Sequence, residues 1–187
     1  LKITTTVAFG SHWLAARMSE FIDIYPEIDC HLLLLDREVD LSMREADLAI
    51  RFSPPRQADL IQRHLMTVHM HIYASAGYIK KHGVPQSPKE LDKHRSGVDG
   101  EAGRPPVPGV NWRLRVGYKD GQLRRASMTV NNVYGVMKAV QSGAGIGALP
   151  EFMAASNPDL VQVLPELSGP QFDAYFVYAE EMRRSKR

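Results

Sequence analysis

Asp47-Leu48-Ala49-Ile50-Arg51 near one end of the chain and Gly143-Ala144-Gly145-Ile146-Gly147-Ala148-Leu149-Pro150 near the other decide the fold of this 187-residue sequence. Each is a short apolar run bounded by charged residues or glycine, a pattern typical of a buried strand. With the opening stretch Leu1–Thr6, they predict two small α/β units that face each other across a cleft. Such an architecture is suited to sensing a small molecule.

The first part of the chain predicts strands and helices in alternation. Strands are expected at 1–7, 28–35 and 47–52, with a helix from Ser11 to Tyr25 that Pro26 ends and a short polar helix from Asp36 through Met43. Connections between these elements are short. A βαβαβ order of this kind favours a parallel sheet with right-handed crossovers.

A second unit is predicted from the middle of the chain. A long strand at 60–74 runs from the first unit into the second, and a strand at 172–178 returns. Between them the pattern predicts helices near 76–81 and after Asn131-Asn132, and strands near 112–116, 122–130 and 146–149, with Gly143 ending the second helix. The expected division is therefore 1–72 with 178–187 as subdomain I, and 73–177 as subdomain II.

Composition is that of an ordinary globular protein, with 44% hydrophobic residues, 24% charged residues and a net charge of +2. This charge is too small to indicate nucleic-acid binding, and the basic run at 183–187 is read as a solvated tail. The single cysteine, Cys30, cannot form an internal disulfide and is expected on a strand in a reducing compartment. Neither a signal peptide nor an apolar run of membrane-spanning length is visible.

Other chemical patterns are contradicted by their context. The glycines at 143–147 lie between a helix and the strand that follows, the reverse of a dinucleotide-binding turn. His69 and His71 share a strand face, but a third metal ligand at useful spacing is not visible. Ser11 and His12 are merely adjacent, and the sequence shows no assembled catalytic set. No cofactor, no metal and no enzymatic activity are expected.

A set of motifs occurs in the order in which LysR-type transcriptional regulators carry them: Phe9-Gly10, Tyr25-Pro26, Asp36-Arg37, the run at 47–51, Tyr73-Ala74-Ser75, Gly83-Val84-Pro85 and the run at 143–150. Over its whole length the chain resembles the effector-binding domain of that family. The resemblance implies a type-2 periplasmic-binding-protein-like α/β fold, in which two Rossmann-like subdomains joined by crossover strands enclose a ligand cleft. Since the chain begins at Leu1 rather than Met, we expect a fragment that lacks the family's N-terminal helix-turn-helix.

The resemblance also maps nine residues to the effector site. They are Thr6, Ala8, Phe9, Ser11 and His12 at the start of the first helix, Arg37 and Arg51 after the second and third strands, and Asn131 and Asn132 at a helix start in subdomain II. Helix N-termini present unpaired N–H groups and partial positive charge, so a small anionic metabolite is the expected effector. Ala8 stands where many members have Ser or Thr, so we expect more dependence on backbone amides, Thr6 or Ser11.

Each of these residues also has a purely structural interpretation. Arg37 could pair with Glu38 or Asp40 on an exposed turn, and Arg51 could pair with Asp47 or close the hinge. The two asparagines could do no more than cap a helix, and the same holds for the hydroxyl side chains.

A homodimer is expected as well, because the helices predicted at 11–25 and 132–142 carry more apolar residues than one buried stripe requires. The family resemblance implies that the first of these helices packs antiparallel beside the second helix of a partner chain. The expected contacts are Met18, Tyr25, Tyr134 and Val140.

The resemblance therefore predicts the effector-sensing domain of a cytoplasmic transcription regulator. Its expected partners are a small-molecule effector, a second copy of the chain, further copies in a full-length tetramer, and promoter DNA through the N-terminal domain, with no membrane. A free-standing solute-binding protein of a transport system and an enzyme on the same fold are the alternatives. The sequence that precedes Leu1 would discriminate the regulator from the transport protein.

Overall fold

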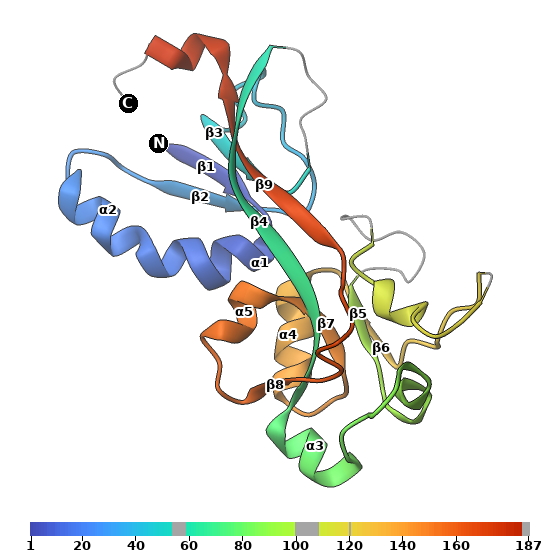
Figure 1. The fold of residues 1–187 in the computed structure, drawn as a ribbon. Coiled ribbons are helices and arrows are strands. Elements are labelled where there is room, and N and C mark those ends of the chain that lie inside the picture. Colours follow the sequence, from blue (N-terminus) through green and yellow to red (C-terminus); the bar gives the residue numbers. More distant parts are fainter. Residues whose placement is uncertain (54–58, 100–108, 120, 185–187) are drawn as a thin grey trace. The chain divides into compact units, whose positions relative to one another are not determined.

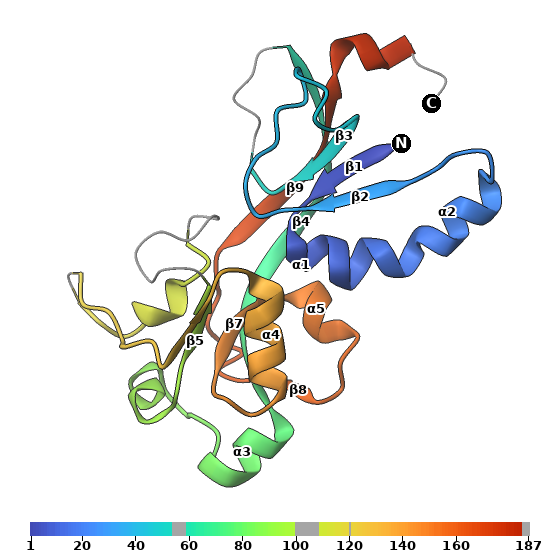
Figure 2. The same ribbon diagram turned by 180° about the vertical axis from the view of Figure 1, so that it is seen from behind.

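A computed structural model describes residues 1–53, 59–99, 109–119 and 121–184 (Figures 1 and 2). The chain divides into two compact units: unit 1, Leu1–Thr67 with Phe172–Arg187, and unit 2, Val68–Gln171. The sequence predicted that the chain passes between the two units at 72/73 and again at 177/178. The units therefore divide a few residues earlier in each of the connecting strands, β4 (Leu60–Ser75) and β9 (Gln171–Ala179).

Unit 1 is built on a sheet whose first three strands are parallel, as predicted. β1 (Lys2–Thr5) pairs in parallel with β2 (His31–Leu34) and with β3 (Leu48–Arg51), while β9 pairs antiparallel with β3. Their register places Thr5 beside Leu34 and Ile50. All three parallel strands thus end at the same edge of the sheet. The second strand is shorter than expected, and half-buried Cys30 lies just before it.

A continuous helical run over residues 7–24 follows β1 (Figure 1). It consists of α1 (Val7–Phe9), a π-helical turn (Gly10–Leu14), a 3-10 turn (Ala15–Arg17) and α2 (Met18–Ile24). The prediction that this helix begins at Ser11 is wrong, because Thr6 is its N-cap and the Thr6 hydroxyl oxygen accepts the N–H of Phe9 at 3.3 Å. The predicted end is confirmed, since Tyr25 is the C-cap.

The short polar helix predicted from Asp36 through Met43 is also wrong, because residues 36–45 form bends and turns. The carboxylate of Asp40 accepts the N–H groups of Ser42 and Met43 at 2.9 and 3.2 Å, and Arg44 adopts a left-handed backbone with φ 58°. An Asp side chain that satisfies these donors competes directly with helix formation.

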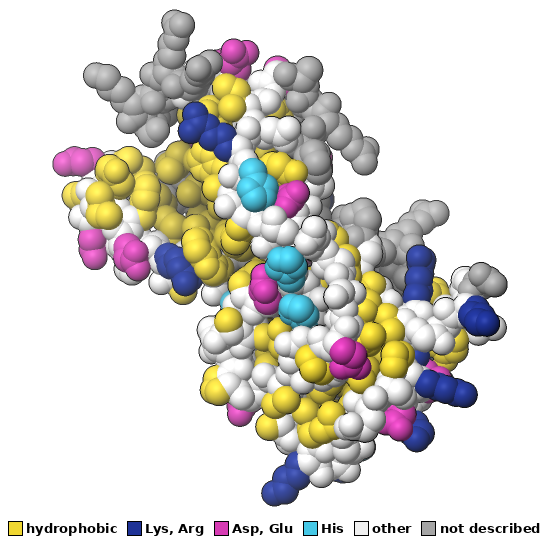
Figure 3. All heavy atoms as spheres, in the orientation of Figure 1, with side chains coloured by type: hydrophobic (Ala, Val, Ile, Leu, Met, Phe, Trp, Pro, Cys, Tyr) yellow, Lys and Arg dark blue, Asp and Glu magenta, His cyan; other side chains and the backbone are white. Residues whose placement is uncertain are grey.

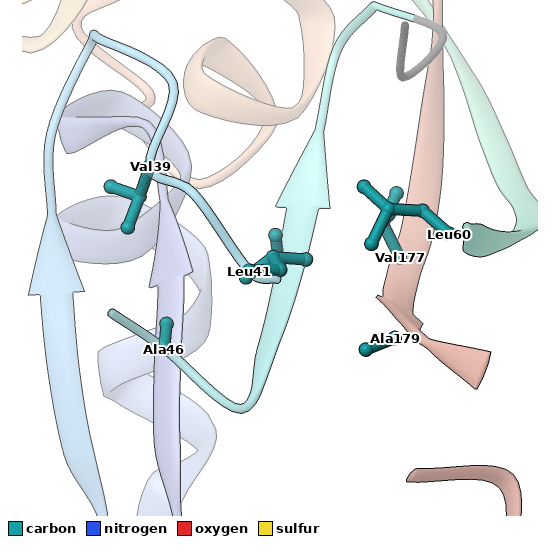
Figure 4. Close-up of a cluster of buried hydrophobic side chains, with 7 residues drawn as sticks. Val39, Leu41, Ala46, Leu60, Val177 and Ala179 are labelled. Atoms are coloured by element: carbon teal, nitrogen blue, oxygen red, sulfur yellow. The ribbon is translucent and has the colours of Figure 1, made fainter. Parts of the chain in front are cut away.

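The core of unit 1 lies on the sheet face opposite the helical run. Side chains of a strand alternate between faces, and Leu34 lies directly beneath Gly10 of the helical run. Leu33 and Leu35 consequently point to the other face, where they pack against a buried apolar cluster (Figure 4). The cluster consists of Val39, Leu41, Ala46, Ala49, Leu60, Val177 and Ala179.

Unit 2 combines the second half of β4 with short strands and helices. β4 pairs antiparallel with β7 (Gly147–Pro150) and β8 (Leu160–Gln162), and β5 (Gly97–Asp99) pairs in parallel with β6 (Met128–Val130). Its helices are α3 (Ala76–His82), α4 (Val133–Gln141) and α5 (Glu151–Ala155), with 3-10 helices at Pro88–Lys93 and Trp112–Leu114. The predictions of α3 and of α4 after Asn132 are confirmed, whereas residues 112–114 are helical rather than a strand.

Two buried arginines hold the irregular part of unit 2 together. Arg113, only 1% exposed, donates to the Ser96 hydroxyl at 2.6 Å and to the Gly97 carbonyl at 2.8 Å. Arg124 donates to the Asp92 carboxylate at 2.6 Å and to three carbonyl oxygens. Burial, and then the charge of Arg124, lowers the pKa of Arg113 to about 10, so the guanidinium still carries its charge at neutral pH.

Helix α4 turns one apolar face into unit 2, and this corrects the expected dimer contact at Val140. Val140 is 1% exposed, and a Cβ built on Gly147 of β7 would lie only 2.6 Å from it. Its side chain thus belongs to the interior of unit 2, while Tyr134 on the same helix is half-buried. Gly143 follows the helix with φ 78°, the left-handed conformation that suits glycine at a helix end.

Among the helices of the described residues, none is both long enough and apolar enough to cross a membrane.

Candidate functional site

The carboxyl edge of the parallel strands in unit 1 is the candidate binding site. Ligands of open α/β sheets bind at this edge, because helix starts and loops converge there. We define the strand-edge site by the residues that follow β1 and β2, namely Thr6, Val7 and Ser11 of the first helical run, and Asp36 and Arg37.

A hydrogen bond across the strands joins the two parts of the strand-edge site. The N–H of Val7, in the first turn of the helical run, donates to the Asp36 carboxylate at 3.2 Å. Leu35 continues the pairing of β2 with β1, as its N–H donates to the Thr5 carbonyl at 2.9 Å. This pairing carries Asp36 to the helix start, where a carboxylate satisfies a donor that the helix itself leaves unpaired.

The role of Asp36 was missed in the sequence, which assigned this residue to the start of a polar helix. Burial raises the pKa of its carboxyl group from the usual 3.8, and the hydrogen bond from Val7 partly opposes that rise. The signal in the sequence was the position of Asp36 directly after a predicted strand, adjacent to Arg37. A carboxylate at this place would repel an anionic ligand unless the ligand displaces it or it takes up a proton.

The two arginines expected to contact an effector differ in their surroundings. Arg37 is exposed beside Asp36, so its guanidinium is available to solvent and ligands. Arg51 is buried, and it donates to the Val39 carbonyl at 2.6 Å rather than forming the ion pair considered with Asp47. In unit 1, Arg51 therefore anchors the loop that follows Arg37.

The remaining predicted residues of the first helix separate into two groups. Ala8 and Phe9 are buried, and the Phe9 ring stacks on Trp13 with ring centroids 5.0 Å apart. These two can offer only backbone groups to a ligand. Ser11 and His12, both half-buried, lie in the π-helical turn, an element found frequently at functional sites.

Thr5, the last residue of β1, has a polar atom that stands out near this edge. Its hydroxyl oxygen is buried without a hydrogen-bond partner in the described part of the chain. Buried hydroxyls are ordinarily bonded, so the Thr5 hydroxyl is an exception among the described residues.

Asn131 and Asn132 belong to unit 2, at the start of α4. The Asn132 side-chain oxygen accepts the Gly135 N–H at 2.7 Å, and its amide group donates to Asn131 at 3.1 Å. The helix-cap interpretation of Asn132 is thus confirmed. Asn131 is exposed, and its amide group keeps donors for a ligand.

Histidine and acidic side chains also gather over β4 (Figure 3). In unit 1, His64 lies 3.2 Å from the Asp173 carboxylate, which accepts the Thr67 hydroxyl at 2.7 Å and whose pKa is lowered, first by that bond. In unit 2, the N–H of His69 donates to the Glu151 carboxylate at 3.4 Å. Across the described ranges, no cluster of three or more His, Cys, Asp or Glu side chains could hold a metal ion.

The strand-edge site is chemically equipped for binding. It offers hydroxyl groups from Thr6 and Ser11, a guanidinium from Arg37 and a carboxyl group whose charge can change. Hydroxyl groups and a guanidinium supply hydrogen-bond donors and positive charge, which are the groups that commonly bind oxyanions.

Comparison with known proteins identifies the relatives of this chain. The family model described as LysR substrate binding domain matches residues 1–187. The chain is 31% identical to the probable HTH-type transcriptional regulator LtrA of Klebsiella pneumoniae and 30% identical to the HTH-type transcriptional activator TtdR of Escherichia coli K12, in each case over 100% of its length. It spans only 62% and 60% of those two proteins.

Solved structures share the fold. The CrgA regulatory domain of Neisseria meningitidis superimposes with a TM-score of 0.85 at 24% identity, over 100% of this chain and 92% of that one. The regulatory domain of AphB in Vibrio vulnificus gives 0.75 at 25% identity, over 98% and 93%. These likenesses confirm the predicted type-2 periplasmic-binding-protein-like α/β fold.

Proposed function

Because this chain belongs to the family of LysR substrate-binding domains, we propose that it senses a small anionic metabolite for a transcriptional regulator and binds it at the strand-edge site. The observation that carries the proposal is the helix start after β1, where Thr6 is the N-cap, the Val7 N–H donates to the Asp36 carboxylate, and the exposed Arg37 follows Asp36 in the chain. An anionic group bound there gains charge-assisted hydrogen bonds to Arg37 and to the helix start.

Asp36 makes the binding of acidic effectors at the strand-edge site dependent on pH. An effector that carries a carboxylate competes with Asp36 for the Val7 N–H, since both are acceptors. Asp36 then turns away or becomes protonated, which its raised pKa favours. When Asp36 becomes protonated, binding of an acidic effector is coupled to proton uptake and strengthens as the pH falls.

In unit 2, Asn131 and Asn132 differ in what they can offer a ligand. The exposed Asn131 amide has donors for a ligand carbonyl or hydroxyl, whereas Asn132 is committed to the α4 cap. The effector contacts of Ser11, His12 and Asn131 stay predictions of the family resemblance.

The wider role of the protein follows from its relatives. They are HTH-type regulators of which this chain covers 60–62%, so we propose that promoter DNA is bound by another part of the full-length protein. We place its action in the cytoplasm, where the bacterial chromosome lies. The family consists of regulators rather than enzymes, and the strand-edge site is assigned to binding rather than to catalysis.

A thermal-shift screen with small carboxylates and their uncharged amides tests the proposal. A ligand at one hundred times its dissociation constant adds about 2.7 kcal/mol of stability, which shifts the midpoint by several degrees. We expect hits among the carboxylates, and we expect Thr6→Val and Arg37→Gln to weaken each hit about tenfold. Arg63→Gln, an exposed arginine on β4, serves as the matched control. Equal stabilisation of all three variants would remove the effector from the strand-edge site.

A further inference from the structure

We propose that unit 2 carries a second binding site, for a small molecule with a phosphate or carboxylate group, in a hollow between α3 and the end of α4. The hollow has a volume of about 410 Å³, and its walls include Tyr78, Lys81, His82, Arg95, Gly143 and Asp159. It shares no residue with the strand-edge site. We refer to it as the α3 hollow.

Positive charge dominates the α3 hollow. Lys81 and Arg95 line it as exposed cations, and the neighbouring ring of His82 adds a further nitrogen donor or acceptor. Asp159 is the single carboxylate in the lining. Two cations and one carboxylate in the lining favour an anionic ligand. The Asp159 carboxylate could accept a hydrogen bond from a hydroxyl or amino group of the same ligand.

Arg95 is held in place at the wall of the hollow. Its guanidinium donates to the Gly143 carbonyl at 3.3 Å and lies over the Tyr78 ring, with 5.8 Å between the guanidinium carbon and the ring centroid. Within the described residues, this is the one hydrogen bond of the Arg95 side chain. A guanidinium has five N–H donors, so four donors of Arg95 make no hydrogen bond to the described residues.

The aromatic wall behind Arg95 is fixed as well. Tyr78 is buried. Its hydroxyl oxygen accepts the backbone N–H of Arg95 at 3.1 Å and lies 3.3 Å from Nδ1 of His94. The ring of His82 packs on that of Tyr78, with centroids 4.4 Å apart. A ligand therefore meets a preformed surface, and binding does not have to order it.

The geometry of the Arg95 guanidinium indicates the class of ligand. A planar guanidinium fixed on one side can bind an oxyanion through two parallel N–H bonds, and a lysine beside it adds charge without a directional demand. An arginine with no role other than to be solvated would not need contacts that fix its guanidinium. Arg95 contacts Gly143 and Tyr78 and also lines the hollow, so we expect its other donors to be available to a ligand there.

Titrations of the ¹⁵N-labelled chain with inorganic phosphate and, separately, with succinate test this proposal at fixed pH and ionic strength. We expect saturable shifts of the Gly77, Arg95 and Gly143 amide signals with at least one of the two ions, and the ion that saturates identifies the anionic group. Arg95→Gln, which keeps a donor for the Gly143 carbonyl, should weaken this binding at least tenfold. Lys81→Gln should weaken it severalfold.

Lys138→Gln is the matched control, since Lys138 is exposed on α4 but does not line the hollow. It should bind as the wild type does, and urea unfolding verifies that all variants are folded. Shifts that stay linear with both ions up to tens of millimolar would overturn the proposal. So would unchanged affinity in both Arg95→Gln and Lys81→Gln.

Discussion

Asp36 would compete directly with the proposed anionic effector, because its carboxylate already accepts the Val7 N–H. Two opposing influences act on it. Burial disfavours the charged form, while the hydrogen bond from the helix start favours it, and burial is the larger influence.

The variant Asp36→Asn tests this balance through pH. A carboxyl pKa raised by folding contributes stability below the unfolded-state value, and that contribution is lost as the pH rises through the folded-state value. Asparagine keeps an oxygen for the Val7 N–H but does not titrate. We expect the stability of Asp36→Asn relative to wild type to be higher at pH 7 than at pH 3.5, as measured by urea unfolding. A difference that does not change with pH would contradict the assigned cause.

Gly10 allows the helical run to lie against β2, since a Cβ at this position would overlap the Leu34 side chain. We expect Gly10→Ala to lower the free energy of unfolding by about 1–3 kcal/mol, the usual cost of overpacking. Gly77→Ala is the matched control, because a Cβ there meets no atom within 4 Å and α3 should gain about 0.5–1 kcal/mol. Urea unfolding at neutral pH compares the two, and a stability loss in both would contradict the proposed contact.

For individual residues, the sequence placed Thr6, Ser11 and Arg37 at or after the ends of predicted strands, but it did not show which hydrogen bonds form around them. Thr6 and Ser11 are both good N-cap residues, so a local pattern could not choose between them. The choice depends on Asp36, which reaches the helix start from a strand 29 residues later in the chain. Similarly, the burial of Arg51 depends on a carbonyl in a loop whose conformation was predicted incorrectly.

Among the elements, the 3-10 helix at Trp112–Leu114 is attached to β5 mainly through a buried charge. Removing Arg113 leaves the Ser96 hydroxyl and the Gly97 carbonyl without their partner and opens a cavity. We expect Arg113→Ala to lower the free energy of unfolding by about 3 kcal/mol or more. The exposed neighbour Arg115 gives the control Arg115→Ala, with an expected change within about 0.5 kcal/mol. Similar urea midpoints for both variants would contradict a structural role for Arg113.

Elements with a strong local signal could be predicted, and the others could not. α3, α4 and the parallel strands of unit 1 have clear caps or apolar patterns, and the structure contains all of them. The segment 112–116 alternates like a strand, but the Arg124 guanidinium donates to the Arg113 and Val116 carbonyls and holds the segment in a compact turn. The apolar pattern of α4 likewise did not reveal that Val140 faces Gly147 of β7.

For the molecule as a whole, the end of α2 indicates association between copies. Ile22, Ile24 and Tyr25 are 48%, 67% and 50% exposed, which gives three large apolar side chains at one helix end. We expect the chain to sediment as a dimer at micromolar concentration and Ile24→Asp to weaken that dimer at least tenfold, about 1.4 kcal/mol. Val84→Asp places the same charge at an exposed apolar residue of unit 2 as a control. A monomeric wild type would contradict this interface.

The central claim is that an anionic effector binds at the strand-edge site, and an NMR titration tests it most directly. The ¹⁵N-labelled chain is titrated with the strongest carboxylate from the thermal-shift screen. We predict saturable shifts centred on the amides of Val7, Phe9 and Ser11, whose N–H groups lie at the start of the helical run, and their loss in Thr6→Val. Saturable binding that leaves these three amides unmoved would contradict the account.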